Sequence, residues 1–177
     1  MIAAVGLVSV AVVAQSPPAP LKLVRVDRAG TATVLGTLPL NAFAVRVSPD
    51  GQRIVYDTGD NAIWIAELNS LESPRRLAVG RFPLWSADGT RVLFIVANGE
   101  GVQQLFWQAA DGSDTPQLLV AAARAPESWF PDGDRFTYIT LKNAGDYDIW
   151  SFSVRDRATK ALVAFEGTSS RFRPLRA

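Results

Sequence analysis

Apolar and β-branched residues in this chain gather in short runs that are separated by turn residues. Three of these runs share one pattern, in which an arginine precedes three residues that are apolar, aromatic or β-branched. They occupy residues 53–56, 91–94 and 135–138. Short runs of this composition between turn signals are typical of β-strands. The pattern therefore predicts strands that recur in register along the chain.

Each of these runs follows a four-residue turn pattern. The turns read Ser-Pro-Asp-Gly at 48–51, Ser-Ala-Asp-Gly at 86–89 and Phe-Pro-Asp-Gly at 130–133. Proline sets φ near about −65° at the second position, aspartate binds local amides, and glycine accepts a positive φ. The chain can therefore reverse at each turn without strain, and we expect a hairpin there.

A second repeated feature is an aromatic residue in the middle of each unit, followed thirteen residues later by an apolar one. The aromatic residues are Trp64, Phe106 and Trp150, and the apolar ones are Leu77, Leu119 and Val163. Their regular placement favours packing between neighbouring repeats over stacking on a ligand. Trp85 and Trp107 lack this regularity, and we expect them in the core or at a sheet edge.

The repeat length indicates the architecture. The turn aspartates Asp50, Asp88 and Asp132 are separated by 38 and 44 residues, close to the period of four-stranded propeller blades. We therefore predict an all-β partial β-propeller: three four-stranded antiparallel blades plus part of a preceding blade, in an open arc rather than a closed ring. The expected strands are 43–47, 52–57, 62–68 and 74–79, then 82–86, 91–97, 103–109 and 116–120, then 126–130, 134–141, 147–154 and 160–165.

The same alignment divides the chain into units of a single domain, 1–177. The full blades are expected at 43–79, 82–120 and 126–165. Residues 7–36 are expected to be part of a preceding blade, with a strand at 7–13 beside residues 21–27, and residues 171–177 to begin a further blade. Two open blade faces predict self-association or marginal stability.

Residues 2–14 are nearly all apolar and allow two interpretations. With the following Gln-Ser-Pro-Pro they resemble a secretory signal peptide, but no Lys or Arg precedes Lys22. The stretch is also too short to span a bilayer. Five valines between residues 5 and 13 favour a strand instead. We prefer the strand, and the signal peptide stays open.

Composition excludes several classes of function. Of the 177 residues, 48% are hydrophobic and 20% charged, which suits a folded core. The net charge of +1 and the lack of a basic run argue against a nucleic-acid partner. The chain has no cysteine and no histidine, so it cannot itself supply a disulfide, a Ser-His-Asp triad or a histidine-bound metal.

The string 48–56, the Ile63-Trp64-Ile65 strand and the Arg-Arg-Leu at 75–77 resemble the TolB-type propeller repeat. The resemblance covers about residues 21–175, with two departures: Ala87 replaces a turn proline and Phe130 a turn serine. Segments 23–30 and 105–112 are also similar to propellers attached to some bacterial serine/threonine protein kinases, whose kinase motifs are absent here. The resemblance implies a non-catalytic scaffold that binds a protein or small ligand, in a periplasmic or other extracytoplasmic location.

Candidate binding residues are three arginines in the loops that enter the first strand of each blade. In propellers such loops ring the mouth of the central channel, so Arg81, Arg124 and Arg171 could hold an acidic group of a partner or a small anionic ligand. The alternative is ordinary solvated arginines paired with neighbours. Arg53, Arg91 and Arg135, beside the turn aspartates, are expected to be structural. No catalytic residue or cofactor is predicted.

Two acidic sets could offer oxygens to calcium, namely Asp57, Asp60 and Asn61, and Asp146 with Asp148. Neither has the spacing of a known calcium loop, so no metal is predicted. Two other functions remain open. The chain could be the accessory propeller of a membrane-anchored kinase or of a prolyl-oligopeptidase-like hydrolase, although it contains no Gly-x-Ser-x-Gly motif. It could also be a truncated product without a function of its own.

Overall fold

The computed structural model describes residues 19–143 and 146–164. The predicted strand at 7–13 and the predicted start of a further blade at 171–177 lie outside these residues. The described chain contains strands and turns but no helix, so no helix there could cross a membrane. The all-β prediction is confirmed.

The strands form one two-stranded and three four-stranded antiparallel sheets. The first sheet consists of β1 (Leu21–Val26) and β2 (Ala32–Leu38), the position expected for the last two strands of a preceding blade. In each four-stranded sheet, called blades 1 to 3 below, neighbouring strands are consecutive in the sequence. Blade 1 contains β3 (Ala42–Val47), β4 (Arg53–Thr58), β5 (Ala62–Glu67) and β6 (Ser70–Val79).

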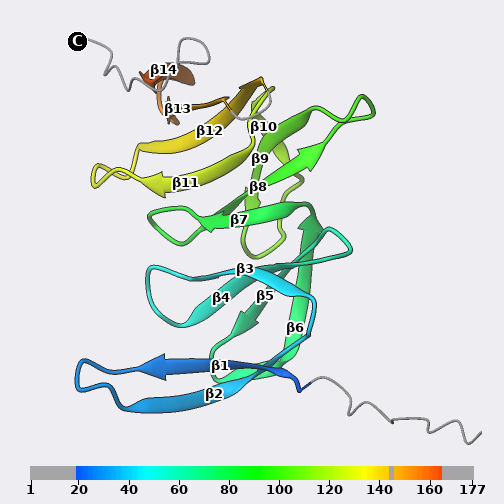
Figure 1. The fold of residues 1–177 in the computed structure, drawn as a ribbon, viewed down its shortest axis with the longest axis vertical. Helices are drawn as coiled ribbons and strands as arrows, with labels where there is room; N and C mark the ends of the chain where they lie inside the picture. The colour runs from blue at the N-terminus through cyan, green and yellow to red at the C-terminus, as the bar shows by residue number, and fades with distance from the viewer. Residues whose placement is uncertain (1–18, 144–145, 165–177) are drawn as a thin grey trace, which may run out of the picture.

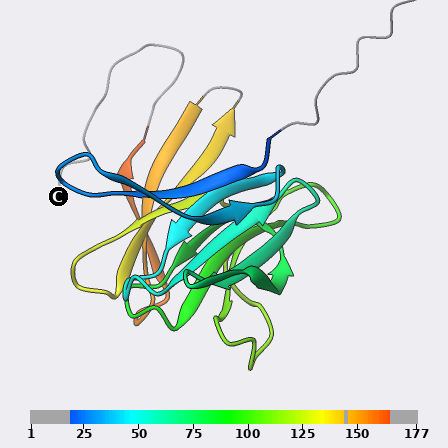
Figure 2. The ribbon, with the colours of Figure 1, turned by 90° about the horizontal axis from the view of Figure 1, so that it is seen from below.

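Blades 2 and 3 repeat this plan. Blade 2 contains β7 (Arg81–Trp85), β8 (Arg91–Ala97), β9 (Gln103–Ala109) and β10 (Gln117–Val120). Blade 3 contains β11 (Ala125–Trp129), β12 (Arg135–Asn143), β13 (Asp146–Ser153) and β14 (Ala158–Val163). The sheets stack face to face, with the Asp-Gly turns on the left in Figure 1. Figure 2, seen along the stack, shows that successive sheets are rotated relative to one another, so the described residues form an open arc of blades.

Some strand ends differ from the predicted ones. Strand β6 begins at Ser70 rather than at 74, because Ser70 pairs directly with Glu67 across a two-residue turn. Strand β12 extends to Asn143 rather than 141, since Asn143 pairs with Asp146. The first strands of blades 1 and 2 also contain an irregularity that the sequence pattern did not show: Ala44 and Phe82, at equivalent positions, have φ of 41° and 54°.

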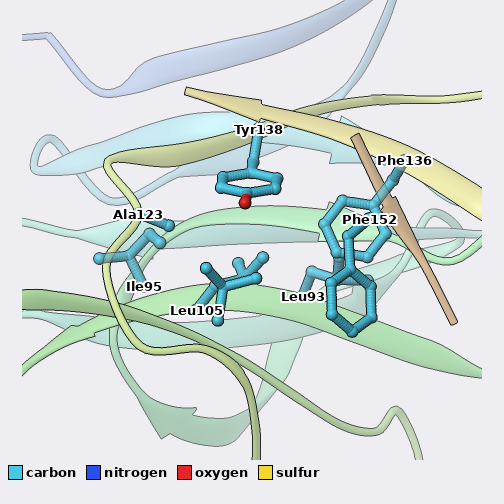
Figure 3. Packing of buried hydrophobic residues seen from close by; sticks show 8 residues of the cluster. Leu93, Ile95, Leu105, Ala123, Phe136, Tyr138 and Phe152 are labelled. Carbon is cyan, nitrogen blue, oxygen red and sulfur yellow. The ribbon is translucent and has the colours of Figure 1, made fainter. Parts of the chain in front are cut away.

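The core lies between the sheets, in three clusters that each join two neighbouring sheets. Alternate residues of a central strand serve alternate interfaces, as the period of a β-strand requires. In β8, Val92 and Phe94 pack toward blade 1, whereas Leu93 and Ile95 pack toward blade 3. Figure 3 shows the interface between blades 2 and 3, where Tyr138 lies over Ile95 and Leu105.

The repeated aromatic residues have the structural role that the sequence predicted. Trp64 packs into the cluster shared with the first sheet, Phe106 into the cluster shared with blade 1, and Trp150 into the cluster shared with blade 2. Each aromatic residue therefore packs its own blade against the preceding sheet. Burying a ring of this size contributes about 1.5 to 3 kcal/mol.

Candidate functional site

The turn arginines hold the Asp-Gly side of the arc together. The guanidinium of Arg53 lies 4.7 Å from the centre of the Trp85 ring and donates a hydrogen bond of 2.9 Å to the Gly89 carbonyl of the next turn. Arg91 pairs with Asp114 at 2.9 Å and covers Trp107. Arg135 pairs similarly with Asp132 and covers Phe130. These contacts are those of structural residues, as the sequence indicated.

On the opposite side of the arc, Arg81 begins β7 and Arg124 immediately precedes β11. The residue before each arginine donates a backbone hydrogen bond to the loop of the preceding blade: Gly80 to the Asn61 carbonyl at 2.8 Å, and Ala123 to the Gln103 carbonyl at 2.9 Å. In register, Arg81 pairs with Ile95 of the adjacent strand, and in blade 3 the equivalent Ile139 pairs with Ala125. Arg124 therefore lies one residue before the register position of Arg81, and its amide donates to the Ile139 carbonyl at 2.7 Å. The third predicted residue, Arg171, lies outside the described residues.

The two arginines differ in their electrostatic partners. Asp57, at the end of β4, is fully buried, and its Oδ2 lies 3.4 Å from both Arg81 Nε and the Phe82 amide nitrogen. The left-handed backbone of Phe82 directs its amide toward this carboxylate. The Arg81 guanidinium also lies 5.0 Å from the ring of its neighbour Phe82. Arg81 is therefore held by a buried negative charge.

Arg124 has no such carboxylate within the described residues. The repeat position of Asp57 is occupied in blade 2 by Ile95, which is 3% exposed. Arg124 itself is exposed, and no ion pair or side-chain hydrogen bond of its guanidinium occurs among the described residues. The sequence pattern did not distinguish the two arginines. In the structure Arg81 pairs with the carboxylate of Asp57, whereas Arg124 has no ion pair among the described residues.

A cavity of about 220 Å³ lies beside Arg124, between blades 2 and 3. Its wall includes Gly101 and Val102 from the loop between β8 and β9, Gln103, Ala123, Thr140 and Leu141. Gly101 has a φ of 79° and donates to the Asn98 carbonyl, while the Asn98 side chain accepts from the Glu100 and Val102 amides. This loop is longer than its equivalent in blade 1, which links β4 directly to β5 through residues 59–61.

Sequence reasoning missed Gln103 and this loop as parts of a site. The sequence did contain one indication that the blades differ here. Asp57 is charged, whereas the other two blades have isoleucine at the same repeat position. The residues proposed for calcium do not assemble. Asp60 accepts a hydrogen bond from the Thr58 hydroxyl, which is the first cause of its lowered pKa, and no group of three or more acidic residues in the described chain could hold a metal ion.

These features define an open arc of β-propeller blades with an arginine-bearing cavity on one side. No protein-family model matches the chain, and no curated protein does so. Among solved structures, TolB of Acinetobacter baumannii is 18% identical with a TM-score of 0.66, over 83% of this chain and 38% of that one. A protein described as TolB from Agrobacterium tumefaciens is 20% identical with a TM-score of 0.63, over 75% of this chain and 49% of that one.

The β-propeller domain of the Trilobed protease from Pyrococcus furiosus is 17% identical with a TM-score of 0.51, over 67% of this chain and 41% of that one. At these identities the likeness shows the fold, which is a TolB-like β-propeller. The chain spans about half or less of the length of these proteins.

Proposed function

We propose that the chain is a non-catalytic binding scaffold that recognises an acidic group, carried by a protein partner or a small anionic ligand, through Arg124. The observation that carries this proposal is the contrast between the two arginines at the entry to the first strands of blades 2 and 3. Arg81 lies against the buried carboxylate of Asp57, whereas Arg124 is exposed beside a cavity and has an isoleucine in place of that carboxylate. An arginine without an internal partner can form a charge-assisted, two-point contact with an incoming carboxylate.

The loop that forms the cavity wall supports the same proposal. The cavity wall comes from a loop whose length differs between repeats, and binding residues of rigid scaffolds are concentrated in such loops. The chain has no histidine or cysteine, which removes the common nucleophile and base pairs. The proposal includes an extracytoplasmic location, which rests on the resemblance to TolB-type repeats and is tested by fractionating cells that produce the protein.

The test measures binding of a fluorescein-labelled peptide whose only charged residues are three internal Asp and Glu residues and whose C-terminus is amidated. Fluorescence anisotropy is recorded at about 20 mM ionic strength, where exposed charges are weakly screened. Replacing Arg124 by Gln removes a charge-assisted hydrogen bond of about 1.5 to 3 kcal/mol and should weaken binding about 10- to 100-fold. Arg81→Gln is the matched control and should change the affinity by less than about twofold.

A second variant introduces a carboxylate in blade 2 at the repeat position that Asp57 occupies in blade 1. Ile95→Asp places at blade 2 the residue that Asp57 provides at blade 1, so it should weaken binding as Arg124→Gln does, provided that circular dichroism shows a folded protein. Equal effects of Arg81→Gln and Arg124→Gln would overturn the proposal, as would a failure of the wild-type protein to bind both this peptide and peptides with a free C-terminal carboxylate.

The alternative is an accessory propeller of an enzyme. The likeness to the propeller domain of a protease favours a hydrolase as that enzyme. The kinase form of this alternative rests only on the similarity of segments 23–30 and 105–112 to kinase-attached propellers. Sequencing the reading frame on both sides of the chain tests both forms, because an in-frame catalytic domain would establish the accessory role.

A further inference from the structure

The cavity beside Arg124 combines three kinds of chemistry within a small volume. Arg124 supplies a positive charge, Gln103 and Thr140 supply hydrogen-bonding groups, and Val102 and Leu141 supply apolar surface that is 41% and 45% exposed. Its volume of about 220 Å³ is below the roughly 300 to 1,000 Å³ of pockets for drug-sized ligands. The cavity therefore suits a group no larger than about one amino-acid residue.

Gln103, in the cavity wall, is one of the residues with an unsatisfied polar side-chain atom. Its backbone is fixed, because its carbonyl accepts the hydrogen bond from Ala123. Its side-chain Oε1 is buried and has no hydrogen-bond partner among the described residues. An unpaired buried acceptor destabilises the folded state. Turning this amide into the adjacent cavity would relieve that loss if a ligand there offered an N–H donor.

The cavity is specific to the interface between blades 2 and 3. At the equivalent place between blades 1 and 2, the backbone of Gly80 packs so closely that an added Cβ would lie 2.7 Å from the Phe94 ring and 2.9 Å from the Ile95 carbonyl oxygen. Between blades 2 and 3 the equivalent residue is Ala123, whose Cβ is accommodated. The longer loop at Asn98–Val102 then adds a wall that blade 1 does not have.

We propose that this cavity binds the C-terminal residue of a peptide chain with an apolar last side chain. This inference rests on the proposed function and specifies its ligand. The terminal carboxylate pairs with Arg124, the last peptide N–H donates to the Gln103 amide oxygen, and the apolar side chain lies against Val102 and Leu141. A terminal residue presents these three groups within one residue's length, whereas an internal Asp or Glu residue presents a carboxylate and a peptide N–H but no apolar side chain of its own.

The experiment compares fluorescein-labelled pentapeptides that have no charged side chain before the last residue and end in Leu, Phe, Ala or Lys, each as the free acid and as the C-terminal amide. The free acids ending in Leu or Phe should bind at least about tenfold more tightly than their amides, since amidation removes the charge-assisted contact with Arg124. In Arg124→Gln that difference between acid and amide should disappear.

Gln103→Leu gives a second readout. It should weaken binding of the free acids and at the same time raise the melting temperature of the unliganded protein, because it removes the unpaired buried oxygen. A residue with a merely structural role would not show these opposite effects.

Three results would overturn the inference, and the first two also decide whether the proposed function stands. If acids and amides bind equally weakly while the internally acidic peptide still binds through Arg124, the C-terminal ligand is wrong and the proposed function stands. If neither kind of peptide binds, both are wrong. Binding of the free acids that is unchanged in Arg124→Gln would also contradict the inference.

Discussion

Asp57 shows how one residue changes the role of a repeat position. In blades 2 and 3 the equivalent residues, Ile95 and Ile139, are apolar and face the next blade or the end of the arc. Asp57 is instead a fully buried carboxylate whose two contacts, with Arg81 Nε and the Phe82 amide, are both long at 3.4 Å, and whose Oδ1 has no partner among the described residues. A buried charge satisfied this poorly adds little stability compared with an apolar residue of similar size.

We therefore expect Asp57→Ile to leave the free energy of unfolding unchanged or to raise it by up to about 2 kcal/mol. Arg81→Gln should lower it by about 1 to 3 kcal/mol, because the buried carboxylate then loses its charged partner. Urea unfolding monitored by tryptophan fluorescence measures both. The explanation is contradicted if Asp57→Ile destabilises the protein more than Arg81→Gln does.

The turn aspartates should make the folding stability of the protein depend on pH in the acid range. Hydrogen bonds from the Ser48 hydroxyl and the Gln52 amide lower the pKa of Asp50. At Asp88, burial raises the pKa, but hydrogen bonds from Ser86 and Thr90 outweigh it and the net shift is downward. The pKa of Asp132 is lowered first by the Arg135 backbone amide. Each folded-state pKa therefore lies below the value of about 3.9 found in unfolded chains.

Between the folded and unfolded pKa values the unfolded chain binds more protons, so stability rises with pH in that window. This contribution is complete above about pH 4 to 5 and is lost as the pH falls through the lower folded values. Thermal melts from pH 6 to pH 2 should show a falling melting temperature below about pH 4. The triple variant Asp50→Asn, Asp88→Asn, Asp132→Asn should show a shallower fall, and a slope equal to that of the wild type would refute this origin.

At the scale of elements, the turns pack against one another along one side of the arc. An added Cβ on Gly89 would lie 3.4 Å from Cδ of Pro49, and one on Gly133 would lie 3.6 Å from Cβ of Ala87. Each second turn residue therefore lies next to the glycine of the following turn. The absence of side chains on these glycines leaves room for a proline ring at position 87, as it does at position 49.

Ala87→Pro should raise the free energy of unfolding by about 0.4 to 1 kcal/mol, because it restricts the unfolded chain at a position where the other two turns already have proline. The preceding residue, Ser86, follows the end of β7, and the Ala87 amide makes no backbone hydrogen bond among the described turns. The reverse change, Pro49→Ala, is the matched control and should lower stability by a similar amount. A loss of stability in Ala87→Pro, measured by chemical unfolding, would contradict the equivalence of the two turns.

The repeat made most of the fold predictable from sequence, because turn, central strand and aromatic residue recur at fixed offsets. Strands β8 and β9 match the predicted 91–97 and 103–109 at both ends. The left-handed residues Ala44 and Phe82 were not predicted, since neither residue type favours a positive φ and tertiary contacts determine it. In blade 3 the equivalent residue is Pro126, whose ring excludes a positive φ.

The candidate site was predictable only in part. Aligning the repeats was enough to find arginines near the start of the first strand in blades 2 and 3, and in the structure Arg81 begins β7 while Arg124 immediately precedes β11. Their different electrostatic surroundings depend on residues from another blade, 24 positions before Arg81 in the case of Asp57. Contacts across such distances follow from the packing of blades rather than from a local pattern.

At the scale of the whole molecule, both ends of the described arc expose apolar sheet surface. On the first sheet, Val24, Val26 and Val34 are 41%, 62% and 57% exposed. On blade 3, Tyr147 is 43% exposed, and the cross-strand pair of Ile139 and Ile149 is only partly buried. Surfaces of this kind mark interaction sites or promote association.

We predict that the isolated chain self-associates, because stacking of end faces buries the valines of one copy against another. Sedimentation velocity over a hundredfold concentration range should show a rising weight-average mass. Val34→Lys, at an exposed position on the first sheet, should reduce the association without lowering the melting temperature by more than a few degrees. A monodisperse monomer with a sharp melt at all concentrations would show that the ends are covered.

We propose that Asp57 pairs with Arg81 in blade 2, whereas Arg124, at the entry to blade 3, is free to bind a ligand. The most direct measurement is an NMR titration of the arginine side-chain Nε–H signals, assigned with Arg81→Gln and Arg124→Gln, using the internally acidic peptide as ligand. We expect the Arg124 signal to move in a saturable way while the Arg81 signal stays in place. Equal movement of the two signals, or movement of Arg81 alone, would contradict this proposal.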